Sequence, residues 1–427
     1  MSSRHGTKRS LPSRVLRRAR RLPLGYVTAM RAVCTELPRV GKRRPRPRTR
    51  STGAAGHRRL PGLVHTAVQR IPGPPAAGLS PQQQTELHDA ATAALSGVVP
   101  AAELADAWPA PGHIAPVWWA LQHRRQHLSH RAIRYGDAPE QVLDVWRAKD
   151  VPTQPAPVLV FVPGGAWVRG KRILQGYALM SHLAQQGWLC VAINHRAGRD
   201  NPWPSHLLDV KAAVAWTRAH AAEFGGDPEF VAICGASSGA HLAALTALTH
   251  DDHDFSVAEL DGVDTSVDAV AALYGRYDWE TTSTRLDKGF VQFLEHVVVG
   301  KRFKEHPHLF RSASPIARVR SDAPPFFVVH GTADRFVPVS HARSFVEKLR
   351  ATSQSPVGYL EVPDGRHCFD LTDGLRTGTA VTAIGLFLSE MYRRKRMRAC
   401  DVAVRTATGS SPPPVPRRSN VPNERMT

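Results

Sequence analysis

From about residue 130 to about residue 392, short apolar runs alternate with longer stretches whose apolar positions recur every three or four residues. A short apolar run is typical of a buried strand, and the wider spacing is typical of a helix with one buried face. Strands are predicted at 132–135, 142–146, 158–162, 189–194, 230–234, 269–273, 326–329 and 358–362. Helices are predicted at about 173–187, 205–224, 240–250, 340–351 and 377–393.

This alternation predicts a single α/β domain over residues 76–392. The first two strands are expected to form a hairpin, and strands joined by helices are expected to pair in parallel. Right-handed crossovers then place helices on both faces of a mostly parallel sheet, which gives three layers. Two helical segments fall outside the alternation and are predicted to be cap segments, one at 76–129 and one inserted at 276–316.

Basic residues are concentrated at the two ends of the chain, which carries a net charge of +20. Residues 1–60 contain 18 Lys and Arg against one acid, and residues 392–427 contain nine against two, whereas residues 61–391 carry 29 basic and 33 acidic side chains. We predict that 1–75 and 393–427 are largely disordered extensions. Their charge would attract an anionic membrane surface or another polyanion, without specific recognition of nucleic acid.

The rest of the composition is that of a globular protein in a reducing compartment. No apolar stretch approaches the roughly 18 residues that a membrane-spanning helix needs. The Arg-rich start is not followed by the apolar segment of a secretory signal. The five cysteines are widely spaced and form no CxxC pair, so neither a disulfide framework nor a metal site is predicted. We expect a cytoplasmic location, with the basic ends able to support peripheral association with a membrane.

The candidate nucleophile lies in the motif Gly-Ala-Ser-Ser-Gly at 235–239, between the predicted strand 230–234 and the predicted helix 240–250. A sharp turn from strand to helix exposes the central serine of a G-x-S-x-G motif, and small residues on both sides prevent clashes. The middle position carries the nucleophile, so we choose Ser237 over its neighbour Ser238. The backbone N–H of Ser238 is predicted to donate to an oxyanion.

A second glycine-rich motif, Pro-Gly-Gly-Ala-Trp at 163–167, follows the predicted strand 158–162. Two glycines and an alanine leave backbone amides unobstructed by side chains, as an oxyanion hole requires. A tight turn between a strand and a helix would favour the same glycines.

A catalytic serine needs a base, and the base needs a group that orients it. Asp334 follows the predicted strand 326–329 and His367 follows the predicted strand 358–362. Ligands bind at the carboxyl ends of strands in open α/β sheets, and all three candidates fall there in the order serine, acid, histidine. Asp364 and Asp370 are rival acids, but they lie too close to His367 in sequence to orient it easily.

These motifs together resemble the α/β-hydrolase esterases, in particular carboxylesterases and lipase-like enzymes allied to hormone-sensitive lipase and prenylcysteine methylesterases. The resemblance covers about residues 130–392. It implies that the amides of Gly165 and Ala166 join that of Ser238 in the oxyanion hole, and that Trp167 lines the acyl pocket. The family usually has histidine where this chain has Pro163, so the resemblance leaves the bracing of this loop unexplained.

The resemblance implies an α/β-hydrolase fold and hydrolysis of small to medium acyl esters through an acyl-enzyme, with no metal or organic cofactor. An amidase, formamidase or thioesterase would use the same residues. A protein of a different class would bind polyanions or membranes through the basic ends and keep a vestigial hydrolase domain. Labelling of Ser237 by a fluorophosphonate would separate the enzymes from the binding protein.

Overall fold

The computed structural model describes residues 79–108, 126–149, 154–256 and 260–408. The predicted extension 1–75, the part of the expected cap segment at 109–125, and residues 409–427 of the predicted C-terminal tail lie outside the described residues.

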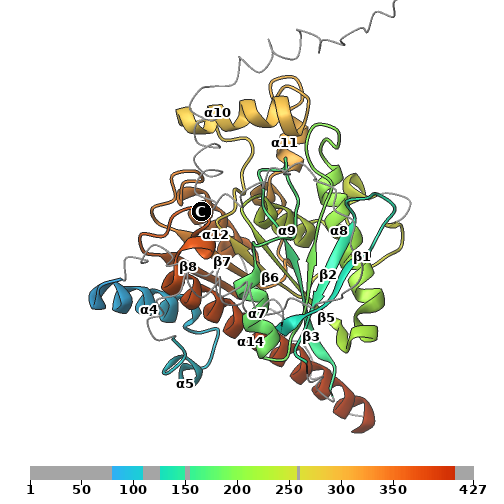
Figure 1. Cartoon of the computed structure of the whole chain (residues 1–427), viewed down its shortest axis with the longest axis vertical. Helices are drawn as coiled ribbons and strands as arrows, with labels where there is room; N and C mark the ends of the chain where they lie inside the picture. The colour runs from blue at the N-terminus through green and yellow to red at the C-terminus, as the bar shows by residue number, and fades with distance from the viewer. Residues whose placement is uncertain (1–78, 109–125, 150–153, 257–259, 409–427) are drawn as a thin grey trace, which may run out of the picture.

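Eight strands form one sheet in the order β1-β2-β4-β3-β5-β6-β7-β8 (Figure 1). The hairpin β1–β2 and the pair β2–β4 are antiparallel, and every other neighbouring pair is parallel. The strands are β1 Leu128–Arg134, β2 Val142–Trp146, β3 Ala156–Val162, β4 Leu189–Ile193, β5 Gly226–Ala236, β6 Ala269–Leu273, β7 Phe326–Gly331 and β8 Val357–Val362. Each predicted strand is therefore confirmed, with shifts of a few residues at its ends.

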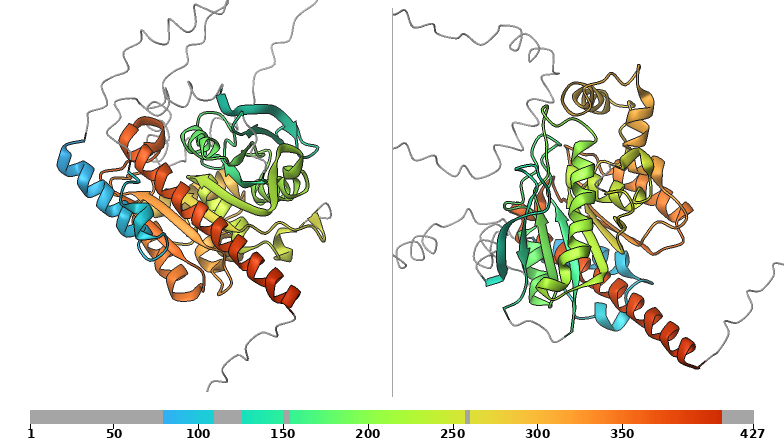
Figure 2. Two further views of the ribbon diagram at one scale, coloured as in Figure 1. Left: turned by 90° about the horizontal axis from the view of Figure 1, so that it is seen from below. Right: turned by 90° about the vertical axis from the view of Figure 1, so that its right-hand side faces the viewer.

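Helices cover both faces of the sheet because side chains along the central strands alternate between two apolar clusters. On β3, Val158, Val160 and Val162 face one cluster, whereas Leu159 and Phe161 face the other. The first cluster packs against α8 Ser205–His220, α9 Ser238–Leu248 and α12 Ser340–Thr352. The second packs against α4 Pro81–Leu95, α7 Tyr177–Gln185 and α14 Gly374–Thr408, and Figure 2 shows α4 and α14 side by side. The predicted three-layer α/β fold is confirmed.

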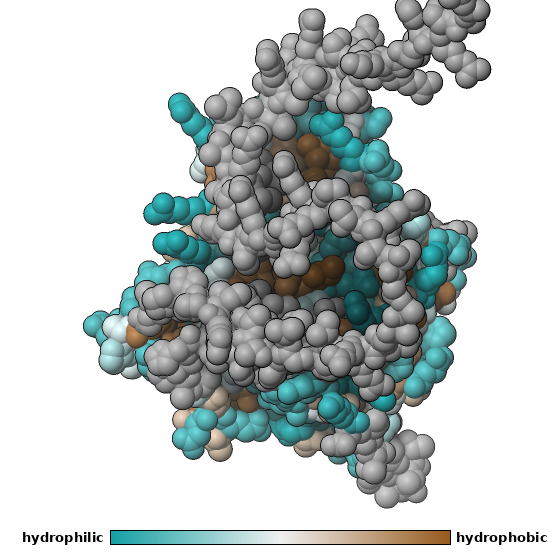
Figure 3. Space-filling view, viewed as in Figure 1, coloured by the Kyte–Doolittle hydropathy of each residue, from teal (hydrophilic) through white to brown (hydrophobic). Residues whose placement is uncertain are grey.

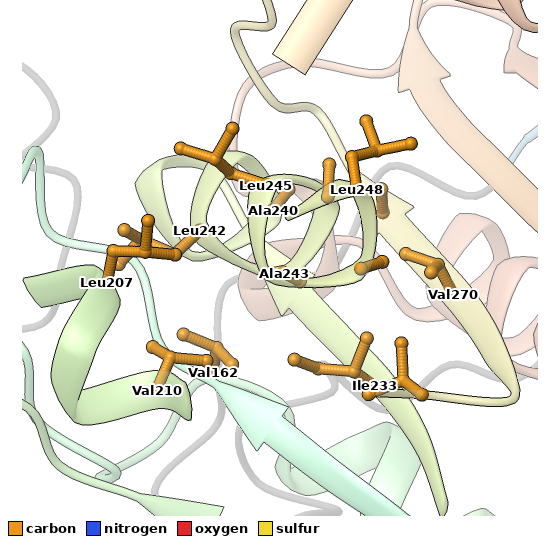
Figure 4. Close-up of a cluster of buried hydrophobic side chains, with 14 of the residues drawn as sticks. Val162, Leu207, Val210, Ile233, Ala240, Leu242, Ala243, Leu245, Leu248 and Val270 are labelled. Carbon is orange, nitrogen blue, oxygen red and sulfur yellow. The ribbon is translucent and has the colours of Figure 1, made fainter. Parts of the chain in front are cut away.

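The helix α9, which begins directly after the candidate nucleophile, lies in the middle of the first cluster (Figure 4). All eleven of its residues are buried. A helix that is apolar on all sides is typical of a protein interior, and alanine and leucine are among the strongest helix formers. Leu242 and Leu245 of α9 lie among Val162, Leu207 and other buried side chains, so this helix is held firmly against the sheet.

The prediction of a disordered tail from residue 393 is wrong as far as residue 408, because α14 continues to Thr408. The sequence between 393 and 408 contains no glycine or proline, and its alanine and arginine residues favour a helix. Neighbouring parts of the fold also hold the extension: Arg394 pairs with Glu390 one turn earlier, and Lys395 pairs with Asp268. Basic composition alone was therefore a poor sign of disorder here.

The described part of the predicted cap segment 76–129 does not form a cap. Helix α4 packs along the edge strand β8 and against α14, with its Leu87, Ala91 and Leu95 in the second apolar cluster. Gly358 permits this approach, because a Cβ atom there would lie 3.0 Å from the carbonyl oxygen of Ala94. The segment therefore extends a helical layer of the domain.

The chain between β6 and β7 forms the helices α10 Arg285–Phe293 and α11 Pro307–Ser312, which project beyond one end of the sheet (Figure 1). Thr284 caps α10, and Asp287 in its first turn forms a buried ion pair with Arg276 at 2.8 Å. A π-helical turn, Leu294–Val298, continues α10 within the inserted segment 276–316.

Candidate active site

Ser237 occupies the tight turn between β5 and α9, with φ 56° and ψ −121°. Its amide N–H donates to the carbonyl oxygen of Leu273 at 2.9 Å, which fixes the turn against β6. Gly235 and Gly239 are needed here, because a Cβ atom on either would lie 2.2 Å from a backbone oxygen. The motif therefore supplies the small residues that let a serine adopt a left-handed conformation at the end of a buried strand.

Three side chains from three different strand ends form a continuous hydrogen-bonded series. The Ser237 hydroxyl lies 3.0 Å from His367 Nε2, and His367 Nδ1 lies 2.6 Å from Asp334 Oδ2. The second carboxylate oxygen of Asp334 accepts the backbone N–H groups of Phe336 and Val337, both at 2.8 Å. These contacts orient the carboxylate, which in turn orients the imidazole toward the hydroxyl.

The charges of this series stabilise each other. Burial by itself raises the pKa of the Asp334 carboxyl, but His367 and His330 outweigh it and hold the pKa below its usual range. Burial by itself lowers the pKa of His367, whereas the sulfur of Cys368 and the carboxylate of Asp334 raise it above the ordinary value. An imidazole that gains a proton during the reaction is therefore supported by a fixed negative charge.

The two rival acids have other partners. The side chain of Asp364 is 70% exposed and lies 3.8 Å from Arg376. Asp370 is buried, and its carboxylate accepts a hydrogen bond from the hydroxyl of Tyr274. Neither carboxylate occupies the position beside His367 Nδ1 that Asp334 takes.

The oxyanion loop, residues 163–167, has an unusual backbone. Gly165, Ala166 and Trp167 all have positive φ values, of 142°, 53° and 55°. A Cβ atom on Gly165 would lie 2.4 Å from the carbonyl oxygen of Arg169. The amides of Gly165 and Ala166 make no hydrogen bond to any residue that the structure describes, and Ser238 is the first residue of α9, where amides lack an acceptor within the helix. Among the described residues none of these three amides has an acceptor, so each could donate to an anion.

Three buried histidines brace this loop, and the sequence analysis did not identify them. His206 Nε2 lies 3.0 Å from the carbonyl oxygen of Trp167, and His195 Nε2 lies 3.4 Å from that of Pro163. The indole N–H of Trp167 donates to His241 Nδ1 at 3.3 Å. These rings supply polar support in a loop where the resembling family would place a histidine at position 163.

Burial keeps two of these rings neutral, since it lowers the pKa of His206 and of His241 to about 3. Neutral imidazole both donates and accepts, and His241 uses both capacities, because its Nε2 lies 2.7 Å from the carbonyl oxygen of Ala313. A histidine inside the otherwise apolar sequence of α9 was the only signal of this role in the sequence.

Trp167 is only 4% exposed. Its indole packs edge-on against the rings of His241 and Trp279, with centroids 5.1 Å apart in both cases. This packing anchors the end of the oxyanion loop, and contact between Trp167 and an acyl group stays a prediction.

In residues 79–108, 126–149, 154–256 and 260–408, no group of histidine, cysteine and acidic side chains could hold a metal ion. None of the described helices is both long enough and apolar enough to cross a membrane.

Esterase LipC of Mycobacterium tuberculosis is 48% identical over 390 residues, which span 91% of this chain and 96% of LipC. The chain belongs to the esterase family of α/β hydrolases. The chain also matches the BD-FAE family model over its residues 143–349. The chain is also 29% identical to ICMEL1 of Arabidopsis thaliana, a probable isoprenylcysteine alpha-carbonyl methylesterase. This match covers 52% of this chain and 47% of that protein.

Among solved structures, the esterase is similar to a truncated carbohydrate esterase from gut microbiota, with a TM-score of 0.54 and 24% identity. The superposition covers 62% of this chain and 98% of that one, and it shows a shared fold. The resemblance predicted from the sequence motifs is confirmed, and the protein is a carboxylesterase that hydrolyses carboxylic esters.

Proposed function

We propose that this carboxylesterase works through an acyl-enzyme formed on Ser237. His367 removes the hydroxyl proton while the serine oxygen attacks the ester carbonyl, and the resulting oxyanion accepts hydrogen bonds from the amides of Gly165, Ala166 and Ser238. Collapse of this intermediate breaks the bond to the alcohol, which leaves with the proton held by His367. Water, deprotonated by the same imidazole, then releases the acid and restores the serine.

The observation that carries the proposal is the series Ser237–His367–Asp334, with separations of 3.0 Å and 2.6 Å. The oxygen and nitrogen atoms are already within reach of proton transfer before any substrate is present. The free amides at 165, 166 and 238 lie on the loop and helix that flank the serine, where negative charge would develop.

We propose acyl esters of small to medium size as substrates. Figure 3 shows a hollow in the middle of the viewed face, where hydrophobic surface lies beside hydrophilic side chains. Apolar surface of this kind suits an acyl chain, and each buried methylene would contribute about 0.8 kcal/mol. A chain-length series of esters would measure this contribution.

Active-site labelling tests the mechanism. A fluorophosphonate should label the wild-type protein at Ser237, and Ser237→Ala should abolish labelling and lower kcat by roughly six orders of magnitude. Ser181→Ala is a matched control, because Ser181 is buried in α7 and its hydroxyl has no partner among the described residues. Labelling that persists in Ser237→Ala would refute the assignment of the nucleophile.

Substrate series then define the bond that is cleaved. p-Nitrophenyl esters of increasing chain length should be hydrolysed faster than p-nitroanilides or thioesters with the same acyl groups. Faster turnover of an amide, a formamide or a thioester would favour the alternative hydrolases that share this triad.

The basic ends of the chain support a second prediction, which concerns location and not chemistry. Anionic vesicles should bind the full chain in a salt-sensitive manner, because 18 of the first 60 residues are Lys or Arg. Equal binding to neutral vesicles, or none to either, would remove both this partner and the predicted peripheral location of a cytoplasmic enzyme.

A further inference from the structure

A second series of buried hydrogen bonds lies beside the catalytic one and links the loop of His367 to the oxyanion loop. The hydroxyl of Tyr274 donates to the carboxylate of Asp370. The side-chain amide of Gln175 donates to the same hydroxyl oxygen at 3.4 Å, and its carbonyl oxygen accepts the backbone N–H of Gly164 at 2.6 Å. Each hydrogen bond of this series joins a donor to an acceptor, so the series runs without a break from Asp370 to Gly164.

Tyr274 stands at the centre of this series. It follows β6 directly, is fully buried, and has a φ of 41° that is fixed by a 2.7 Å hydrogen bond from its N–H to the carbonyl oxygen of Val329. Its ring packs edge-on against the imidazole of His367, with centroids 4.9 Å apart. The same residue therefore contacts the catalytic base with its ring and the second series with its hydroxyl.

Gly164 connects the second series to the nucleophile. A Cβ atom at this position would lie 2.5 Å from the carbonyl oxygen of Ala236 and 3.0 Å from Cβ of Ser237. The backbone of Gly164 thus lies directly against the turn that carries the serine. The hydrogen bond from the Gly164 N–H to Gln175 fixes the peptide plane between residues 163 and 164. This plane directly precedes those that carry the amides of Gly165 and Ala166.

We propose that Gln175, Tyr274 and Asp370 are positioning residues, which hold the amides of the oxyanion loop in register with the catalytic histidine. This inference rests on the proposed function, since it assigns a role in the reaction of Ser237. It explains how three loops on separate strand ends keep a common geometry although the loop 163–167 has three successive residues with positive φ.

The groups around Asp370 favour this role near neutral pH. Burial raises the pKa of the Asp370 carboxyl to about 6, against the opposing effects of the Tyr274 hydroxyl and of the charge on His367. The thiol of Cys234 on β5 also interacts electrostatically with this carboxyl, which raises the pKa of the thiol further above the effect of burial. The carboxylate is therefore available to accept the Tyr274 hydroxyl when the esterase is assayed at pH 7 or above.

Tyr274→Phe is the sharpest test, because it keeps the ring against His367 and removes only the hydroxyl. Activity should be measured per active site, with sites counted by complete fluorophosphonate labelling. We expect kcat to fall roughly 10- to 100-fold, less than the loss of a whole oxyanion donor, with KM changed by less than about twofold. The inhibition constant of a trifluoromethyl ketone, which mimics the oxyanion, should rise by a similar factor.

Tyr277→Phe is the matched control, since Tyr277 is equally buried three residues later and its hydroxyl lies outside the series. An unchanged kcat per labelled site in Tyr274→Phe, or an unchanged inhibition constant, would overturn the proposal. If a fluorophosphonate does not label Ser237 in the wild-type protein, the proposed function fails first. If the wild type is active and Tyr274→Phe matches it, only the positioning role fails.

Asp370→Asn and Asp370→Leu separate positioning from folding. Asparagine keeps an oxygen that can accept a hydrogen bond from the Tyr274 hydroxyl, whereas leucine has a similar volume and no acceptor. We expect Asp370→Asn to restore most of the kcat that Asp370→Leu loses, at equal numbers of labelled sites. Equal kcat per labelled site in the two variants would contradict the series as drawn.

Discussion

Helix α9 and the oxyanion loop both lie against the nucleophile, yet they reach their conformations in different ways. The helix is built from strong helix formers and is buried on all sides by apolar neighbours. The loop 163–167 has three successive residues with positive φ, and side chains from other elements hold it through hydrogen bonds. Changes in the apolar side chains of the helix should therefore affect mainly stability, and changes around the loop should affect mainly rate.

After the loss of the nucleophile itself, the largest effect on rate is expected from the loss of the carboxylate that orients the imidazole. Asp334→Asn should lower kcat by about 10⁴-fold, because the amide no longer holds the imidazole in the required tautomer. Steady-state kinetics and a thermal unfolding curve would check it. Asp364→Asn is the control, since that rival acid lies at the surface. A comparable loss in Asp364→Asn would mean that the orienting acid is misassigned.

The juxtaposition of Ser237, His367 and Asp334, and the helices beside it, could be predicted because each signal is local. An apolar strand ends immediately before Ser237, before the loop of Asp334 and before the loop of His367, so topology alone brings the three together. The bracing of the oxyanion loop could not be predicted in this way. Gln175, Tyr274 and Asp370 lie about 100 residues apart in succession and share no motif, and Asp370 entered the sequence analysis only as a rival acid.

The prediction of a disordered tail was wrong over residues 393–408 for another reason. Arginine is both a marker of disordered basic segments and a good helix former, so composition did not separate the two structures. The decisive contacts are tertiary, such as that between Lys395 and Asp268, and no sequence pattern indicated that Asp268 lies beside the helix.

A smaller effect on rate is expected from the histidines that brace the loop. His206→Leu leaves the carbonyl oxygen of Trp167 without its donor. The strained backbone should then relax, and we expect kcat to fall roughly 10- to 100-fold with KM nearly constant. His341→Leu, a buried histidine beside Asp287, is the control for the loss of an internal imidazole. Equal losses of kcat in both variants would indicate a general packing defect.

The pH dependence should follow the catalytic histidine. In the proposed mechanism the active form has neutral His367, and Cys368 and Asp334 raise its pKa above the ordinary value of 6.5 despite the opposing effect of burial. Activity should therefore rise with pH, about tenfold per unit below a midpoint that lies above 6.5. The pH profile of kcat/KM measures this midpoint, and Asp334→Asn should move it to lower pH. A midpoint below 6.5 in the wild type would contradict the inferred electrostatics.

The smallest effect on rate is expected in the helix, and there the cost should appear in stability. Leu242 of α9 is completely buried beside the β3 layer, so Leu242→Ala should lower the free energy of unfolding by about 2–5 kcal/mol. Chemical denaturation measures this loss. Since the helix keeps its backbone and Ser238 keeps its amide, kcat per labelled site should change by less than about twofold. Should kcat per site fall as steeply as in His206→Leu, the helix would be setting the geometry of the reaction as directly as the loop does, and the distinction between the two regions would be lost.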